Sequence, residues 1–212
     1  MSLSGVERSL LESGKIFEST VSRRENLIRE SREVIALSAR SIVSIHNSRL
    51  EEAKKLQEEA VQILEALRKD AAADLVRYLI PPETEVVECS MILAISTGSK
   101  FPSARQLKVG PASYILGLLD SIGEMKRMVY DKIRSSEYEA AEKIFKIMEK
   151  LYLLLAPFSI YDHVAPGSKR KVDVARILIE ETRGLITEES RRRELTESVS
   201  RLSSQLSAYR AR

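Results

Sequence analysis

The sequence has little of what disulfide-rich, zinc-binding or multi-stranded β proteins require. It contains one cysteine, Cys89, two histidines and no tryptophan, and aromatic residues make up only 5% of its 212 residues. One cysteine excludes an intramolecular disulfide framework, and a lone cysteine with two distant histidines is a poor ligand set for zinc. With 8 glycines and 6 prolines, the chain also has few of the turn residues that β-barrels need.

Long apolar segments and the common catalytic signatures are also missing. The longest apolar runs, such as residues 151–158, are far shorter than a membrane span, and the N-terminal residues contain no apolar signal-peptide core. The chain has no glycine-rich phosphate loop, and neither His46 nor His163 stands near a nucleophile signature. We therefore expect a cytoplasmic protein that does not enter the membrane, with Cys89 as an ordinary core residue.

A helical apolar period dominates the sequence instead. Hydrophobic residues make up 43% and charged residues 31%, which suits a soluble, helix-rich protein. The period predicts a long first helix from about residue 13 to residue 45, with apolar side chains at every seventh position: Val21, Ile28, Ile35 and Ile42. We predict an all-α fold of about seven helices in an antiparallel bundle, formed by a single domain over residues 1–212.

Capping residues and helix breakers predict where these helices begin and end. Ser48 with Glu51, and Ser136 with Glu139, have the spacing of a capping box and predict the starts of the second and fifth helices. The pair Pro81–Pro82 predicts a kink or a short break within a third helical stretch over residues 71–96.

The remaining boundaries depend on proline and glycine. Residues 97–111 are the clearest loop, and Pro111 begins a fourth helix that continues to about residue 134. A second loop is expected over residues 162–171. Gly184 then predicts the end of a sixth helix, with Thr187 as the cap of the last one.

Four acidic side chains interrupt stretches that otherwise have the composition of buried helix. Glu85 and Glu88 are three residues apart, and Asp120 and Glu124 are four apart, so each pair lies on one helix face. Two such charges about 4 Å apart repel by roughly 4 kcal/mol at an effective dielectric near 20. The acids therefore require protons, basic partners or a metal cation. Carboxylates without imidazole favour Mg²⁺ or Mn²⁺.

The helix that contains Asp120 resembles a helix of the translin superfamily, and in particular of its translin-associated factor X subunits. The matching segment is VGPASYILGLLDSIGEMKRM, and residues 77–88 resemble a second segment of the same subunits. The agreement within the first segment is specific, and it comprises Pro111, Tyr114, Leu116, Gly117, Asp120, Gly123, Glu124, Arg127 and Met128.

This resemblance implies a seven-helix protein of the compact archaeal kind that assembles into homo-oligomers, as octamers. It also implies a metal-dependent endoribonuclease that hydrolyses RNA with Mg²⁺ or Mn²⁺. The acidic cluster of the family falls on Glu85, Glu88 and Asp120, with Glu124 as a fourth catalytic or metal-binding group. RNA is the implied substrate, with single-stranded DNA as a further nucleic-acid ligand.

Affinity for RNA has to come from basic residues, because the acidic cluster repels phosphate. The net charge of +3 permits such binding without requiring it. Arg77 is the first candidate for a phosphate contact. Lys126 and Arg127 follow Glu124 and are further candidates. Arg23 and Arg24 on the first helix are the weakest, because exposed arginines are usually solvated surface residues.

Three hypotheses from different classes remain open at this point. The first is the metal-dependent ribonuclease, and the second is a translin-like scaffold that binds RNA or single-stranded DNA without cleaving it. The third is a helical assembly protein whose acids serve subunit contacts. A purely structural ion-pair network would also explain the acids, with four basic partners: Arg77, Lys126, Arg127 and Lys132.

Overall fold

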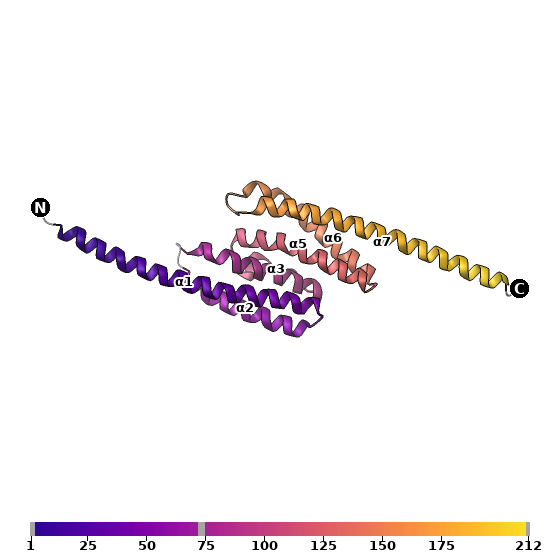
Figure 1. Ribbon diagram of the computed structural model, residues 1–212, viewed down its shortest axis with the longest axis horizontal. Helices are drawn as coiled ribbons and strands as arrows, with labels where there is room; N and C mark the ends of the chain where they lie inside the picture. Colours follow the sequence, from indigo (N-terminus) through magenta and orange to yellow (C-terminus); the bar gives the residue numbers. More distant parts are fainter. Residues whose placement is uncertain (1–2, 72–74, 211–212) are drawn as a thin grey trace. The chain divides into compact units, whose positions relative to one another are not determined.

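The computed structural model describes residues 3–71 and 75–210, and nearly all of them are helical (Figure 1). Within these residues there are seven α-helices, two short 3₁₀ helices and no strand, which confirms the predicted all-α class. None of the described helices is both long and apolar enough to cross a membrane. The elements in order are α1 (Ser4–His46), α2 (Leu50–Asp70), η1 (Val76–Leu79), α3 (Ile80–Thr97), α4 (Ala104–Leu107), α5 (Pro111–Arg134), α6 (Tyr138–Leu155), η2 (Ala156–Tyr161) and α7 (Ser168–Arg210).

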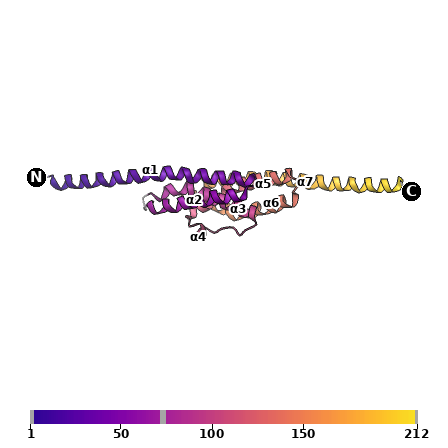
Figure 2. The same cartoon turned by 90° about the horizontal axis from the view of Figure 1, so that it is seen from below.

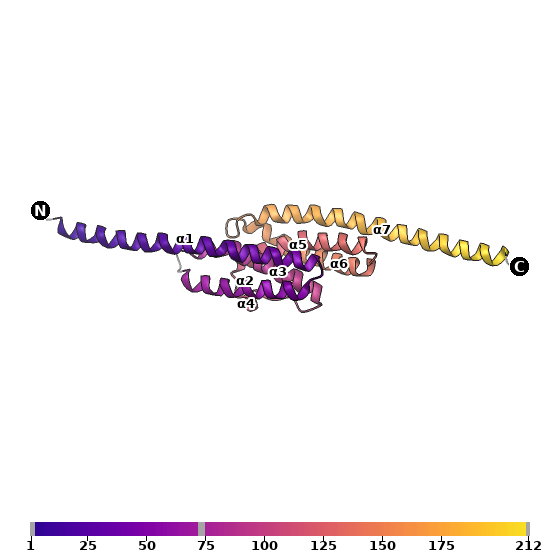
Figure 3. The same ribbon diagram turned by 60° about the horizontal axis from the view of Figure 1, so that its bottom comes forward.

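The chain divides into two compact units, and the long helix α5 belongs to both. The first unit extends to Ser121 and includes Tyr161–Ser168, and the second contains Ile122–Ile160 and the chain from Lys169 onward. Helices α1, α2 and α3 pack on one another in the first unit, and α1 and α2 lie side by side in Figure 3. Single-domain behaviour of residues 1–212 stays a prediction.

The core of the first unit begins part-way along α1. Leu27, Val34 and Leu37 are almost fully buried, together with Leu64 of α2 and Val86 of α3. The α1 residues before Leu27 are largely exposed, and this part of the helix extends beyond α2 (Figure 1). The helix begins at Ser4, nine residues earlier than its apolar period predicted, because helical structure continues past the part that is buried.

Two serines that were predicted to begin helices instead end the preceding ones. Ser48 and Ser136 have φ angles of 60° and 61°. After Ser48, the N–H of Arg49 bonds to the carbonyl of Ser44 at 2.8 Å, and the segment after Ser136 repeats this pattern. These are Schellman motifs, in which a left-handed residue closes a helix C-terminus. The two predicted capping boxes were therefore wrong, and α2 and α6 begin without side-chain caps.

The predictions from proline and glycine had mixed outcomes. Pro81–Pro82 lies in the first turn of α3 directly after η1, which confirms the break, and residues 72–74 of that stretch lie outside the described residues. The loop after α3 contains the short helix α4, which was not predicted (Figure 2). The predicted end at Gly184 was wrong, because α7 passes through it and the Thr187 hydroxyl donates to the carbonyl of Arg183 inside the helix.

Candidate nucleic-acid interface and acidic helices

The four acidic residues lie where their sequence spacing placed them. Glu85 and Glu88 are on α3, Asp120 and Glu124 are on α5, and all four are half-buried. Each of them has polar or electrostatic interactions within the chain. The Glu124 carboxylate is 3.8 Å from the guanidinium of Arg127, one turn further along α5.

Two contacts show that α3 and the first part of α5 run parallel in a fixed register. At the start of both helices, the Ser113 hydroxyl donates to the Glu83 carboxylate at 2.6 Å. One turn later, a methyl group on Gly117 would lie only 2.5 Å from the carbonyl oxygen of Thr84 and 2.6 Å from Cβ of Val87. Only glycine permits so close an approach of two helix backbones.

This register brings the two acidic helices into correspondence. Because both helices rise about 1.5 Å per residue, a contact of Gly117 with Thr84 and Val87 sets Asp120 level with Glu88. Glu124 follows Asp120 by four residues on the same helix face. The close packing at Gly117 therefore determines where the carboxylates of α3 stand relative to Asp120.

Glu83 is a buried carboxylate that was not among the predicted site residues. Its side chain is 8% exposed and lies 3.3 Å from the guanidinium of Arg68. It also accepts hydrogen bonds from Ser113 and from the backbone N–H of Gly110, and Arg68 donates to the carbonyl of Leu107. This network joins α2, α3 and the segment before α5, so Glu83 has a structural role. No local sequence signal links it to Arg68, fifteen residues earlier.

The residues that the structure describes do not form a ready-made metal centre. Across residues 3–71 and 75–210, no three His, Cys, Asp or Glu side chains are grouped so that they can hold a metal ion. The metal-binding and catalytic roles of Glu85, Glu88, Asp120 and Glu124 therefore stay predictions.

Cys89 directly follows Glu88 on α3. It is buried, and the pKa of its thiol is raised to about 12, first by desolvation and also by the negative charges of Glu88 and Glu85. A thiol with such a pKa is a poor nucleophile at neutral pH. The prediction that Cys89 is a core residue is confirmed.

Two of the predicted phosphate contacts, Arg24 and Arg77, converge on one tyrosine. Nε of Arg24 donates to the Tyr78 hydroxyl at 2.7 Å, and Nη2 of Arg77 donates to the same oxygen at 3.3 Å. The centres of the two guanidiniums lie 5.3 and 5.1 Å from the centroid of the Tyr78 ring. Both hydrogen bonds lower the pKa of the Tyr78 phenol, that from Arg24 more strongly. The structure thus joins α1 and η1 in a cluster that the sequence did not predict.

The other predicted phosphate contacts are engaged elsewhere. Lys126 forms an ion pair with Glu181 and lies 5.6 Å from the centroid of the Tyr130 ring. Arg127 pairs with Glu124 at 3.8 Å, and the guanidinium of Arg23 donates to the hydroxyl of Thr20 at 3.4 Å.

The alternative of a structural ion-pair network receives only partial support. Lys132, one of its proposed cations, pairs with Glu137 at 2.7 Å instead of with the four acids. Arg77 donates a hydrogen bond to Tyr78, and Arg127 forms an ion pair with one of the four acids, Glu124.

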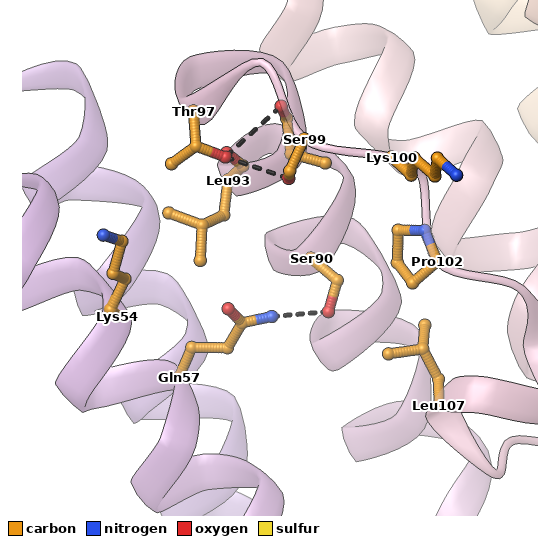
Figure 4. Close-up of a pocket in the computed structure, with 10 residues that line it drawn as sticks. Lys54, Gln57, Ser90, Leu93, Thr97, Ser99, Lys100, Pro102 and Leu107 are labelled. Carbon is orange, nitrogen blue, oxygen red and sulfur yellow. Dashed lines mark hydrogen bonds between the residues drawn. The ribbon is translucent and has the colours of Figure 1, made fainter.

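A cavity of about 490 Å³ lies between α2, α3 and the segment before α5 (Figure 4). Its walls include Leu93, Pro102 and Leu107, and the amide of Gln57 donates to the Ser90 hydroxyl at 2.5 Å on its inner side. Lys100 lies at its edge in the same view. The cavity was not predicted from the sequence, because its walls come from three separate segments.

Comparisons with known proteins give a consistent assignment, although no protein-family model matches the sequence. The chain is 33% identical over 166 residues to the uncharacterized protein MJ0175 of Methanocaldococcus jannaschii, a match that covers 76% of this chain and 73% of that protein. Among solved structures, the crystal structure of AfC3PO is 30% identical with a TM-score of 0.80, over 87% of this chain and 98% of that one.

Two further structures agree. A complex of AfC3PO with duplex RNA is 29% identical with a TM-score of 0.79, over 87% of this chain and 98% of that one. Apo-NeC3PO, at 20% identity and a TM-score of 0.74 over 85% of this chain and 96% of that one, shares the fold. C3PO, the component 3 promoter of RISC, is a translin-family protein. Since the identity to AfC3PO extends over almost all of that chain, the protein described here belongs to the translin superfamily.

Proposed function

We propose that this protein binds RNA and cleaves it as a metal-dependent endoribonuclease. The observation that carries the proposal is the 30% identity to AfC3PO over almost the whole of that chain, together with the complex of AfC3PO with duplex RNA. The positions of the acids on α3 and α5 are compatible with this activity, because the register at Gly117 sets Asp120 level with Glu88. We further propose that the protein acts in the cytoplasm as a homo-oligomer, as an octamer.

The binding part of the proposal assigns phosphate contacts to Arg77 and Arg24, with Arg23 beside them on α1. Arg24 and Arg77 are exposed, and among the residues described neither is paired with a carboxylate. Lys126 and Arg127 are secondary candidates, because an anion has to compete with Glu181 and Glu124 for them. Such contacts bind the backbone rather than the bases, so affinity should fall steeply with salt.

The catalytic part assigns the metal to Glu85, Glu88 and Asp120, with Glu124 as a further ligand or as a group that orients a bound water. Their oxygens suit Mg²⁺ or Mn²⁺, and Mg²⁺ is commonly held by one or two carboxylates together with phosphate oxygens of the substrate. The lack of a three-carboxylate group among the described residues therefore fits an ion that enters with RNA better than one bound permanently. When bound, such an ion lowers the pKa of water and offsets charge on the phosphate.

Contacts within the chain fix the relative positions of the two helices that carry the acids. Gly117 holds α5 against α3, and Glu83 with Arg68 fixes the start of α3, so the carboxylates stand on two helices that cannot slide independently. Arg127 forms an ion pair with Glu124 at 3.8 Å on the same helix. The backbone positions of the acids are therefore set by the packing of α3 and α5.

The test is RNA cleavage by purified protein with Mg²⁺ or with EDTA, on single-stranded and duplex RNA. We expect cleavage that EDTA abolishes, and loss of at least about a hundredfold in rate for Asp120→Asn and for Glu88→Gln. The matched control is Glu142→Gln, an exposed acid on α6 that pairs with Lys146. The mass of the native oligomer should be the same for all variants. Normal cleavage by Asp120→Asn would remove the proposed catalytic residues.

A second candidate function is a translin-like scaffold that binds RNA or single-stranded DNA without cleaving it. The specific observation in its favour is again the missing three-residue metal group among residues 3–71 and 75–210. RNA binding that survives EDTA and both substitutions, with no cleavage under any condition, would select this candidate. No association with RNA at low salt would leave only an assembly role.

A further inference from the structure

Two positively charged side chains are held against a single tyrosine at the junction of α1 and η1. Arg24 and Arg77 each donate one hydrogen bond to the Tyr78 hydroxyl, and each guanidinium lies within 5.3 Å of the ring centroid. The two like charges repel, and among the residues that the structure describes no carboxylate is paired with either of them. Within residues 3–71 and 75–210, the contacts that offset their charge are those with the phenol oxygen and the ring of Tyr78. An anion at this position would compensate them further.

The geometry points to Tyr78 as a positioning residue that makes Arg24 and Arg77 into one binding site for a phosphate of the RNA backbone. This inference rests on the RNA binding proposed above and deepens it, because it names the group recognised and the residue that prepares the site. Tyr78 was not among the residues that the sequence singled out.

The donors available in the cluster suit a single phosphate. A guanidinium has five N–H donors, and Tyr78 takes one from each arginine. Since both donating nitrogens bond to the same oxygen, they lie within about 6 Å of each other, and the oxygens of one phosphate can reach N–H groups of both. The tyrosine limits the freedom of two long side chains before the ligand binds, so less conformational entropy is lost on binding.

The same geometry argues for recognition of the backbone instead of the bases. The Tyr78 ring is already in contact with two guanidiniums, so it is poorly placed to stack on a base. The phenol also serves as the acceptor for both arginines. The site is therefore expected to bind RNA of any sequence and to contribute to salt dependence.

The experiment measures the affinity of the full-length protein for one fluorescent duplex RNA at several salt concentrations, in EDTA so that the RNA stays intact. Arg77→Gln and Arg24→Gln should each weaken binding about tenfold at low salt and reduce the slope of log K against log salt by about 1. If both arginines bind the same phosphate, the double variant should lose little more slope than either single one.

Tyr78→Phe is the decisive variant, because it changes no charge and keeps the ring. We expect it to weaken binding about threefold to tenfold and to reduce the salt slope, with an unchanged thermal unfolding midpoint. Arg29→Gln is the control for the arginine variants, since Arg29 is an exposed arginine on α1 that pairs with Glu30. It removes the same charge from the same helix and should leave the slope unchanged.

The possible outcomes distinguish a failure of the proposed RNA binding from a failure of the inference about Tyr78. If the unaltered protein binds no RNA at low salt, the proposed function fails. If it binds RNA and the Tyr78→Phe variant is indistinguishable from it in affinity and slope, the positioning role of Tyr78 is refuted and the proposed function stands. Equal effects of Arg29→Gln and Arg77→Gln would show a diffuse charge effect and would also overturn the inference.

Discussion

Replacement of Gly117 by alanine should loosen the contact between α3 and α5 on which the acidic residues depend. The new methyl group would lie 2.5 Å from the carbonyl oxygen of Thr84 and within 2.8 Å of two side-chain carbons of Val87. The nearest of these atoms belongs to the backbone, which cannot rotate away. To restore ordinary contact, the two helices have to separate by about 1 Å, because packed interiors hold few voids.

The magnitude follows from two opposing terms. Alanine is favoured over glycine in a helix by about 1 kcal/mol, whereas overpacking of a close contact typically costs 1–3 kcal/mol and more when the backbone has to move. We expect a net loss of about 2 kcal/mol in the free energy of unfolding, measured by urea denaturation, which corresponds to roughly 4–8 °C for a chain of this length. RNA cleavage should fall about a hundredfold, since displacements of about 1 Å have this effect.

Two other glycines provide matched controls. Gly184 lies in α7 with no atom within 4 Å of an added methyl group, and at Gly123 of α5 the nearest atom is 4.0 Å away, on Leu178. Alanine at either position should leave the stability unchanged or raise it by up to about 1 kcal/mol. If Gly117→Ala is as stable and as active as Gly184→Ala, the close backbone contact does not fix the acids, and the argument from register is refuted.

Two further predictions concern buried groups. Glu83→Ala should cost about 3–5 kcal/mol in urea denaturation because it leaves the Arg68 guanidinium without its buried partner. Glu51→Ala breaks an exposed ion pair with Lys54 and should change the free energy of unfolding far less. Equal effects of the two substitutions would contradict the structural role of Glu83. The Cys89 thiol should resist alkylation at pH 8 in the folded protein. Its pKa is raised from 9.0 to about 12, so above pH 9 the unfolded chain loses the proton first, and the stability contributed by this thiol is present below pH 9 and decreases toward pH 12. Cys89→Ala should remove that part of the pH dependence of unfolding, and rapid alkylation of the native protein would contradict the burial.

The sequence was sufficient where the determining interactions are local. Helix α5 extends from Pro111 to Arg134 as predicted, because proline is favoured in the first turn and the apolar period continues without a breaker. The spacing of the four acids gave their helix faces correctly for the same reason. The family resemblance was carried by the same helix, and the solved structures confirm it.

Contacts between segments that are far apart in the chain could not be predicted from the sequence. The hydrogen bond from Arg24 to Tyr78 joins residues 54 positions apart, and nothing in the local sequence of either residue predicts the contact. The role of Glu83 was hidden because an acid in the first turn of a helix already has a sufficient local explanation. The capping boxes predicted at Ser48 and Ser136 were wrong for a related reason. Serine is favoured at the start of a helix, but here both serines adopt a left-handed conformation at a helix end.

One of the proposed phosphate contacts and two of the proposed catalytic acids lie on consecutive elements of the chain, η1 and α3. Tyr78 and Arg77 belong to η1, which leads directly into α3, and the prolines in the first turn of α3 restrict the backbone there. At about 1.5 Å per residue, Glu85 and Glu88 lie roughly 8 and 12 Å along the axis from the start of α3 at Ile80. On the scale of about 3.4 Å per nucleotide along a DNA duplex axis, this separation is on the order of two to four nucleotides. A phosphate held by Arg24 and Arg77 would therefore place a different linkage of the same strand beside the acids, so binding and cleavage can be assigned to separate residues of one rigid segment.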